Sequence, residues 1–313
     1  MNRSVKHILT KYRSVIGLVL FSLVIAVIND RFLTVSNILN VLRQTSINAI
    51  IAAGMTFVIL TGGIDLSIGS TLAYTGAVGA FLVFSGFHPA IAVALALLLG
   101  LAIGLANGVI ISKGRLQPFI VTLATMTIVR GATMVFTDGK PISTGYEAFG
   151  DLFYKIGAGY FLGIPNPVVI MLVTFVVVYF ILNHTTFGRY VYAIGGNEEA
   201  AALSGINVNR IKTIVYGING MLAALAGIII TSRLSSAQPT AGTGYELDAI
   251  AAVVLGGTSL AGGVGSIFGT VIGALIIGIL NNALNLLNVS SYYQLLLKGL
   301  VILIAVLLDR KQK

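Results

Sequence analysis

Long runs of apolar residues, separated by short polar connections, follow one another along almost the whole chain. A helix that crosses a bilayer needs about 20 mostly apolar residues. By this measure the pattern predicts about ten membrane-spanning helices, at residues 14–29, 45–62, 69–85, 89–111, 117–136, 165–183, 212–231, 246–260, 265–283 and 292–308. The apolar runs leave no room for a second domain. We therefore expect a single all-α transmembrane domain that covers residues 1–313.

The composition agrees with this expectation. Hydrophobic residues make up 57% of the chain and charged residues 9%, and the mean hydropathy is +0.98. A soluble domain usually carries about 25% charged residues, so a chain this poor in charge needs lipid around it. Cysteine is absent, which excludes disulfides, thiolate nucleophiles and cysteine metal sites.

Basic residues are distributed unevenly between the two sides of a ten-helix arrangement. The side that holds both termini would carry twelve of them: Arg3, Lys6, Lys11, Arg13, Lys113, Arg115, Arg189, Arg210, Lys212, Arg310, Lys311 and Lys313. The opposite side would carry five: Arg31, Arg43, Lys140, Lys155 and Arg233. Because Lys and Arg gather in cytoplasmic connections, both termini are predicted to be cytoplasmic. The net charge of +9 then indicates contact with anionic lipid, and no nucleic acid partner is expected.

Two stripes of glycines recur at intervals of four residues, namely Gly100, Gly104 and Gly108, and Gly265, Gly269 and Gly273. Small residues at this spacing let two helix backbones approach closely in lipid. The partner helix belongs either to the same chain or to a second copy of it. The many contacts inside a ten-helix bundle favour the same chain.

Motifs of known catalytic chemistry are absent. The sequence contains no G-x-x-x-x-G-K-[ST] phosphate loop, no H-E-x-x-H pair and no nucleophile elbow. His7, His88 and His184 all fall near the ends of predicted spans, so a metal site is not expected. We predict that the chain is not an enzyme and has no catalytic residue, metal or cofactor of its own.

The first group of polar residues at membrane depth lies at 61–67, where the second predicted span ends. Polar groups in lipid cost free energy and are commonly functional. Gly62 and Gly63 interrupt the helix, while Asp65 and Ser67 supply a carboxylate and a hydroxyl, as non-helical backbone that faces a cavity would. Either Asp65 and Ser67 line a solute pathway or gate, or Asp65 caps the following helix. The two interpretations are compatible.

The second group is Tyr245, Glu246 and Asp248, where the chain re-enters the membrane from outside. These residues could line a vestibule for a polyhydroxylated solute or receive a docked partner. The alternative is a helix start, where the macrodipole favours acidic residues. Two carboxylates beside an apolar run need solvent or a partner, which favours a functional role.

Arg130 and Lys298 form a third group, each inside a predicted span. Either residue could pair with Asp65 or Asp248. For Lys298, about a third of the way into its helix, we favour a side chain that extends outward to the membrane surface.

The longest cytoplasmic connection, 184–211, contains the clearest local signal. Asn197 is a good N-cap, and Glu198 and Glu199 suit the first turn of a helix. Gly205 suits the position just after a helix end. Together these residues predict a helix of two turns.

This predicted helix covers residues 198–204. A helix this short is marginal alone in water, so it either packs on its own chain or inserts into the groove of a partner. The size of the connection and the lack of an ATP-hydrolysing motif favour docking.

Four stretches of the sequence resemble permeases of ATP-binding-cassette sugar importers. Residues 196–206, Gly-Asn-Glu-Glu-Ala-Ala-Ala-Leu-Ser-Gly-Ile, resemble the coupling loop of these permeases. Residues 60–67 and 252–263 are similar to further signatures of the family, and residues 234–248 resemble its ribose-importing members most closely. The resemblance covers essentially the whole chain.

The resemblance implies a permease that moves a sugar, D-ribose, from the periplasm to the cytoplasm by alternating access in a bacterial inner membrane. It also implies a homodimer, cytoplasmic ATPase subunits that bind ATP and Mg²⁺, and a periplasmic sugar-binding protein. The residues that would couple to the ATPase are Asn197, Glu198, Glu199, Ala200, Ala201, Ser204 and Gly205. Those that would form the translocation pathway or gate are Asp65, Ser67, Tyr245, Glu246 and Asp248.

Other functions share part of this evidence. Permeases for other pentoses, for hexoses or for branched-chain amino acids share most of the motifs, because specificity is expected mostly in the external binding protein. An ion-coupled secondary transporter would need an ionisable group at the bilayer midplane; the nearest candidate, Asp65, lies at a predicted span end instead. A receptor or scaffold would tolerate disruption of the helix at 198–204.

Overall fold

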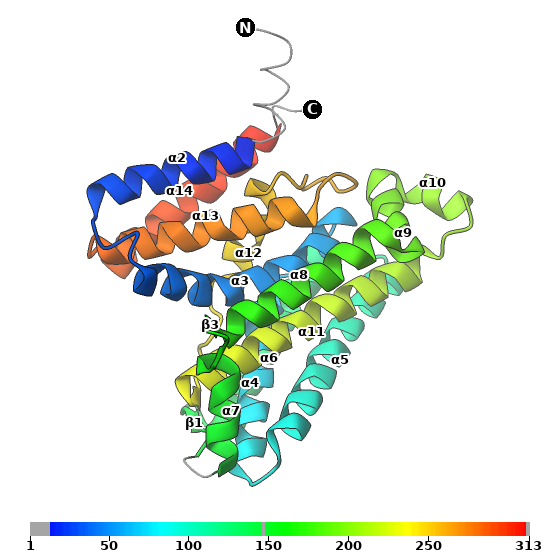
Figure 1. Cartoon of the computed structure of the whole chain (residues 1–313). Coiled ribbons are helices and arrows are strands. Elements are labelled where there is room, and N and C mark those ends of the chain that lie inside the picture. Colours follow the sequence, from blue (N-terminus) through cyan, green and yellow to red (C-terminus); the bar gives the residue numbers. More distant parts are fainter. Residues whose placement is uncertain (1–12, 146–147, 311–313) are drawn as a thin grey trace, which may run out of the picture.

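The structure is a computed structural model that describes residues 13–145 and 148–310. Its helices are α2 (Arg13–Ile28), α3 (Val35–Leu60), α4 (Ile68–Phe84), α5 (Pro89–Gly114), α6 (Pro118–Thr137), α7 (Ala148–Ala158), α8 (Asn166–His184), α9 (Thr186–Gly196), α10 (Glu198–Leu203), α11 (Val208–Leu234), α12 (Tyr245–Leu255), α13 (Ile267–Leu286) and α14 (Ser291–Arg310) (Figure 1). Four strands of two residues each form two antiparallel pairs. Strand β1 (Ile142–Ser143) pairs with β4 (Ser236–Ala237), and β2 (Tyr160–Phe161) pairs with β3 (Ile164–Pro165). The predicted all-α class is confirmed. The basic residues Arg3, Lys6, Lys11, Lys311 and Lys313 lie outside the described ranges.

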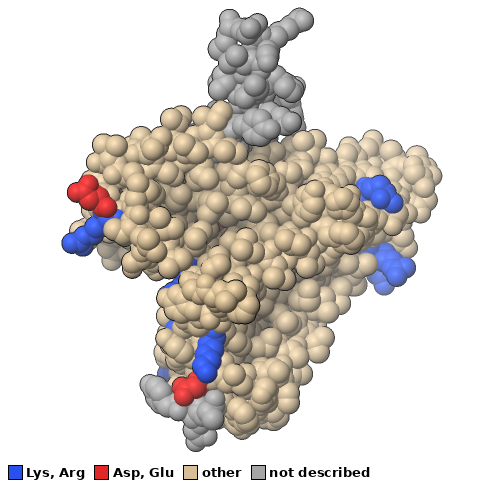
Figure 2. All heavy atoms as spheres, in the orientation of Figure 1, with Lys and Arg blue, Asp and Glu red and all other residues tan. Residues whose placement is uncertain are grey.

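Six helices of the described chain are long and apolar enough to cross a membrane, namely α3, α5, α6, α8, α11 and α13. Helices α2 and α4 provide two shorter apolar segments. On the face drawn in Figure 2, charged side chains gather toward the left and lower left and at the right, and a broad uncharged surface separates them. Helices α9 and α10 lie at one end of the molecule, and α7 with β1 lies at the other (Figure 1). This arrangement fits a bundle whose two ends face water.

The second predicted span, 45–62, begins ten residues later than its helix α3. The eighth, 246–260, is not a full membrane-crossing helix in the structure. Its helix, α12, has 11 residues and ends at Leu255. At about 1.5 Å per residue, 11 residues cannot cross a hydrocarbon core about 30 Å thick. Gly257 and Gly262 have positive φ angles of 91° and 87°, which glycine adopts readily and which end helical structure. The chain therefore continues through residues 256–266 without an α-helix.

Two helices of the structure are not predicted by the hydrophobic pattern, because α7 and α9 are too short for a membrane span. Helix α7 packs against α11, with Phe153 fully buried. The Ser232 hydroxyl of α11 donates a hydrogen bond to the Phe153 carbonyl at 2.5 Å and accepts one from the Gly157 N–H at 2.7 Å. These bonds fix α7 to the end of α11.

Helices α3 and α11 form the centre of the molecule. In the most apolar part of each, 78% of the α3 residues and 72% of the α11 residues are buried, against 22% for α6. Helix α11 contacts α3, α4 and α5. Helix α6 is therefore peripheral, with most of its surface open to lipid, solute or another chain.

The glycine stripes pack within one chain, as favoured from the sequence. A Cβ atom on Gly104 would overlap the Tyr216 carbonyl oxygen of α11, and one on Gly108 would lie 2.5 Å from the Thr213 Cα atom. In the second stripe, a Cβ atom on Gly273 would overlap the Ala252 carbonyl oxygen of α12. These glycines therefore allow close α5–α11 and α12–α13 contacts.

We predict that Gly104→Leu destabilises the protein strongly, because its side chain would meet α11 backbone that cannot move aside. Overpacking of this kind typically costs about 1–3 kcal/mol. The measurement is the thermal unfolding midpoint of the purified protein in detergent. The matched control is Gly17→Leu, since Gly17 also lies in a helix and a Cβ atom added to it would have no neighbouring atom within 4 Å. Equal midpoints for the two variants would contradict the packing argument.

Candidate functional site

Helix α10 has the caps expected from the sequence. The Asn197 side-chain oxygen accepts a hydrogen bond from the Ala200 N–H at 2.9 Å. Gly205 follows the helix with a φ of +85°, and Ser204 is the C-cap residue. The predicted helix at 198–204 is therefore confirmed, one residue shorter at its end.

The same helix is attached to its own chain on one side. Ala201 is 5% exposed and belongs to the buried cluster that contains Val208 and Ile211. The Glu198 carboxylate forms an ion pair with the Lys212 amine of α11 at 2.5 Å. Packing on its own chain, one of the two interpretations of this helix, is thus confirmed. Ala201 holds α10 against its own chain, and its role in coupling to the ATPase remains a prediction.

The other side of α10 is open. Leu203 is 91% exposed, and Glu199, Ala200 and Ala202 are exposed beside it. Leu203 is therefore a candidate docking residue, which the sequence analysis did not include among the coupling residues; the signal was a leucine beside three alanines. A hollow of about 830 Å³ adjoins the helix and is lined by Arg115, Glu198, Glu199 and Lys212 among others.

Asp65 lies in a buried polar network. The residue is 1% exposed, and its carboxylate accepts hydrogen bonds from the Ser67 N–H at 2.9 Å, the Ser67 hydroxyl at 2.6 Å and the Asn219 amide at 2.9 Å. The Asn107 amide donates to the Ser67 oxygen at 3.0 Å, and the Thr125 hydroxyl donates to the Asn107 oxygen at 2.6 Å. The network joins the 61–67 connection to α5, α6 and α11.

This geometry bears on both interpretations of Asp65. The carboxylate organises the turn that leads into α4 by accepting the Ser67 N–H, but Ser67 itself is the N-cap residue. Neither Asp65 nor Ser67 lines any of four hollows formed by the described residues. Within the same part of the chain, no ion pair involves Asp65. A role of these two residues in the pathway or gate remains a prediction.

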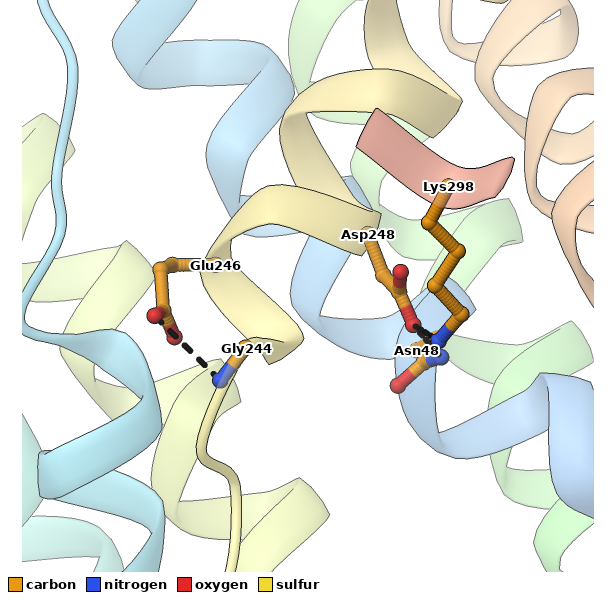
Figure 3. Close-up of polar contacts among 5 residues, drawn as sticks. All are labelled: Asn48, Gly244, Glu246, Asp248 and Lys298. Carbon is orange, nitrogen blue, oxygen red and sulfur yellow. Dashed lines mark hydrogen bonds and ion pairs between the residues drawn. The ribbon is translucent and has the colours of Figure 1, made fainter. Parts of the chain in front are cut away.

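The two carboxylates of α12 point to opposite sides of the helix (Figure 3). Asp248 is 4% exposed and pairs with the Lys298 amine of α14 at 3.0 Å. The Asn48 amide of α3 donates to the same carboxylate oxygen at 3.3 Å. The interpretation favoured for Lys298, a side chain extending outward to the membrane surface, is therefore wrong. Helix α14 packs against α12, and the amine has a buried carboxylate within reach.

Glu246 and Arg130 share a different hollow, of about 540 Å³, between α4, α6 and the start of α12. One Glu246 oxygen accepts the Gly244 N–H at 3.3 Å. Arg130 pairs with neither Asp65 nor Asp248; its Nη1 donates to the carbonyl oxygens of Pro239 and Ala241 at 2.7 and 2.9 Å. Of the predicted pathway residues, Glu246 alone lines this hollow.

Tyr245 and Asp248 therefore do not share a cavity with Glu246. Tyr245 packs against the main hydrophobic core, and Asp248 is occupied by its ion pair. Arg130 also lines the hollow at Glu246, although the sequence analysis considered it only as an ion-pair partner. A charged residue inside an apolar span was the signal that could have found it.

Comparison with known proteins identifies the relatives of this chain. The ribose import permease protein RbsC of Haemophilus influenzae is 59% identical over 308 residues, which cover 98% of this chain and 95% of the relative. The ribose import permease protein RbsC of Bacillus subtilis is 59% identical over 97% of this chain and 94% of its own length. The D-allose transport system permease protein AlsC of Escherichia coli is 42% identical over 90% of this chain and 85% of its own length. No solved structure matches the chain.

A family model described as the permease component of the branched-chain amino acid transport system matches residues 37–306. The match spans the helices from α3 to most of α14 and includes α10, the Asp65 network and both carboxylates of α12. The chain therefore belongs to this family of transport-system permease components.

Proposed function

We propose that this chain is the membrane permease of an ATP-driven, binding-protein-dependent importer that carries D-ribose into the cytoplasm. The observation that carries the proposal is 59% identity to ribose import permeases over almost the full chain, against 42% to a D-allose permease. As a permease component, the chain is a non-enzymatic subunit of a transporter in the bacterial inner, or cytoplasmic, membrane.

The proposed topology has ten spans with both termini in the cytoplasm. Helices α2, α3, α4, α5, α6, α8, α11, α13 and α14 each cross once, and α12 completes its crossing through the glycine-rich segment 256–266. The hydrogen bond from the Gly263 N–H to the Leu60 carbonyl at 3.0 Å supports this, because it ties that segment to the end of α3 beside α9. The excess of Lys and Arg on the side of α10 supports the orientation.

In this arrangement α10 receives force from a separate ATPase subunit, which binds ATP and Mg²⁺. The exposed Leu203 and the hollow beside it support docking at this place. A periplasmic sugar-binding protein delivers the sugar at the opposite end, where α7 and the β1–β4 pair lie. A second copy of the chain completes the pathway, and the mostly exposed surface of α6 supports its involvement in that contact.

Transport then follows from alternating access. Closure of the ATPase moves α10, and the attached spans change their tilt so that the hollow at Glu246 and Arg130 opens to one side at a time. The chain contributes mechanical coupling between two conformations and makes or breaks no covalent bond.

We expect labelled D-ribose to be taken up by cells whose only ribose importer contains this chain, its ATPase and its binding protein. Excess unlabelled ribose should abolish the uptake, D-allose should compete weakly and L-leucine not at all. An importer with a hydrolysis-deficient ATPase is the control and should be inactive. Uptake by the chain alone in liposomes under an ion gradient, without ATP, would overturn the proposal in favour of a secondary transporter.

The topology has a direct test because the chain contains no cysteine. We predict that Leu162→Cys reacts with a membrane-impermeant maleimide on intact cells and that Leu203→Cys reacts only after the membrane is opened. Both side chains are well exposed, at 87% and 91%, so their difference reports the side of the membrane. Labelling of both variants on intact cells would refute the assignment of α10 to the cytoplasm.

Docking at α10 is tested by Leu203→Arg. A charged side chain on the outer face of α10 should prevent entry into an apolar groove, so we expect loss of both ATPase co-purification and ribose uptake. Leu162→Arg is the matched control, because Leu162 is similarly exposed but lies in the turn between β2 and β3. Ala201→Arg is less informative, since it would also displace α10 from its own chain. Normal co-purification of Leu203→Arg would exclude this face as the docking surface.

A further inference from the structure

The hollow between α6 and α12 presents one continuous face of α6. Met126, Thr127, Arg130, Gly131 and Met134 all line it. Residues at this spacing share one side of a helix, so the face combines two thioether side chains with a hydroxyl and a guanidinium group. A lipid-facing surface would be uniformly apolar, and this one is not.

Arg130 has hydrogen-bond donors at this face that are not used within the described chain. Its Nη1 uses both hydrogens on the Pro239 and Ala241 carbonyls and thereby holds the 239–244 loop against α6. A guanidinium group has five N–H donors, and among the described residues no hydrogen bond is formed by Arg130 Nε or Nη2. These three N–H groups are available to a ligand in the hollow.

Hydrogen-bond acceptors come from both sides of the hollow, Thr127 from α6 and Thr243 and Glu246 from the loop and helix opposite. Glu246 accepts the Gly244 N–H with one carboxylate oxygen, and its other oxygen lies against Gly69 at the start of α4. An ionised carboxylate has about four lone-pair sites, so it can accept further hydrogen bonds from a ligand. The Thr127 hydroxyl donates to the Leu123 carbonyl at 3.1 Å, and the Thr243 hydroxyl donates to the Thr240 carbonyl at 2.8 Å. With these protons so used, the lone pairs of both hydroxyl oxygens can accept hydrogen bonds from a ligand.

We propose that this hollow is a binding site for a neutral polyhydroxylated sugar within the membrane chain itself, with Arg130 donating to the sugar and Glu246, Thr127 and Thr243 accepting from it. The proposal rests on the function proposed above and extends it, because it assigns part of the sugar selectivity to the permease. The two opposite charges leave the hollow without net charge, and Met126 and Met134 can contact the C–H face of a sugar ring.

A zwitterionic amino acid is the other neutral ligand that Arg130 and Glu246 could bind. Its carboxylate and ammonium groups would satisfy the two charges, and an ammonium has three N–H donors, which could also reach the Thr127 and Thr243 oxygens. A sugar hydroxyl both donates and accepts, so it matches all four groups as well. The preference for the sugar therefore rests on the 59% identity to ribose import permeases.

The functional test uses the complete reconstituted importer and two conservative variants, Glu246→Gln and Thr127→Val. Each keeps the size of the side chain and removes a charge or an acceptor. A hydrogen bond to a charged group is worth about 1.5–3 kcal/mol, so we expect Glu246→Gln to lower ribose transported per ATP hydrolysed by about ten- to a hundredfold. Thr127→Val should have a smaller effect in the same direction. Stimulation of the ATPase by ribose-loaded binding protein should persist, which a misfolded variant would not show.

A second readout does not depend on transport rate. In the reconstituted importer with Thr127→Cys, alkylation by a maleimide should be slower with ribose-loaded than with sugar-free binding protein, and L-leucine should give no protection. Leu162→Cys, in an exposed turn away from the hollow, is the control for shielding by the docked binding protein itself. The protection of Thr127→Cys should exceed any change in the reaction rate of Leu162→Cys.

The outcomes separate the two proposals. If the unaltered importer transports ribose, but Glu246→Gln and Thr127→Val transport it equally well or ribose gives Thr127→Cys no protection, the sugar site is wrong and the proposed function stands. Protection by leucine would assign the hollow to an amino acid instead. If the unaltered importer moves no ribose, both proposals fail.

Discussion

Helix α11 lies so close to α5 that side chains are excluded from part of the contact, and the buried polar chemistry depends on this proximity. Gly100, Gly104 and Gly220 meet backbone to backbone across the two helices. The same approach places Asn107 of α5 and Asn219 of α11 within hydrogen-bond reach of the Ser67–Asp65 turn. A bulkier interface would separate Asn219 from the Asp65 carboxylate and Asn107 from Ser67. The buried carboxylate would then keep only its two donors from Ser67, because lipid supplies none.

The charged groups at membrane depth are stabilised in three different ways. Asp65 accepts bonds from neutral amide and hydroxyl groups, Asp248 has a lysine partner, and Arg130 donates to backbone carbonyls of a loop. The first two groups have their partners inside the bundle, and Asp65, Asp248 and Lys298 line none of four hollows formed by the described residues. The third is open, because Arg130 and Glu246 keep unused hydrogen-bonding groups beside a hollow. This difference distinguishes groups that hold helices together from groups that can meet a solute.

Much of the fold follows from the sequence, because a span needs a long apolar run and α10 has local caps. The hydrophobic pattern locates eight helices within four residues at each end, and it misses the more polar first ten residues of α3. Asn197 and Gly205 mark the limits of α10. The sequence does not predict features that depend on tertiary contacts. The start of α12 is marked by acidic residues, but its early end depends on glycines packed against α13. The partner of Lys298 depends on which helices adjoin, and the burial of Ala201 depends on how α10 lies on α11. Neither is encoded in local spacing.

The end of α9, directly before α10, contacts two other places where a helix ends. Gly195 lies against the Leu60 carbonyl at the end of α3, and Gly262 and Gly263 lie against Gly195 and Gly196. All of these contacts are between backbones, so no side chain can change rotamer to absorb a displacement there. Movement of α10 must shift the end of α3 and the 256–266 segment together. The end of α3, the end of α9 and the 256–266 segment therefore move as one rigid unit. Their resistance to deformation comes from the peptide backbone and not from side-chain packing.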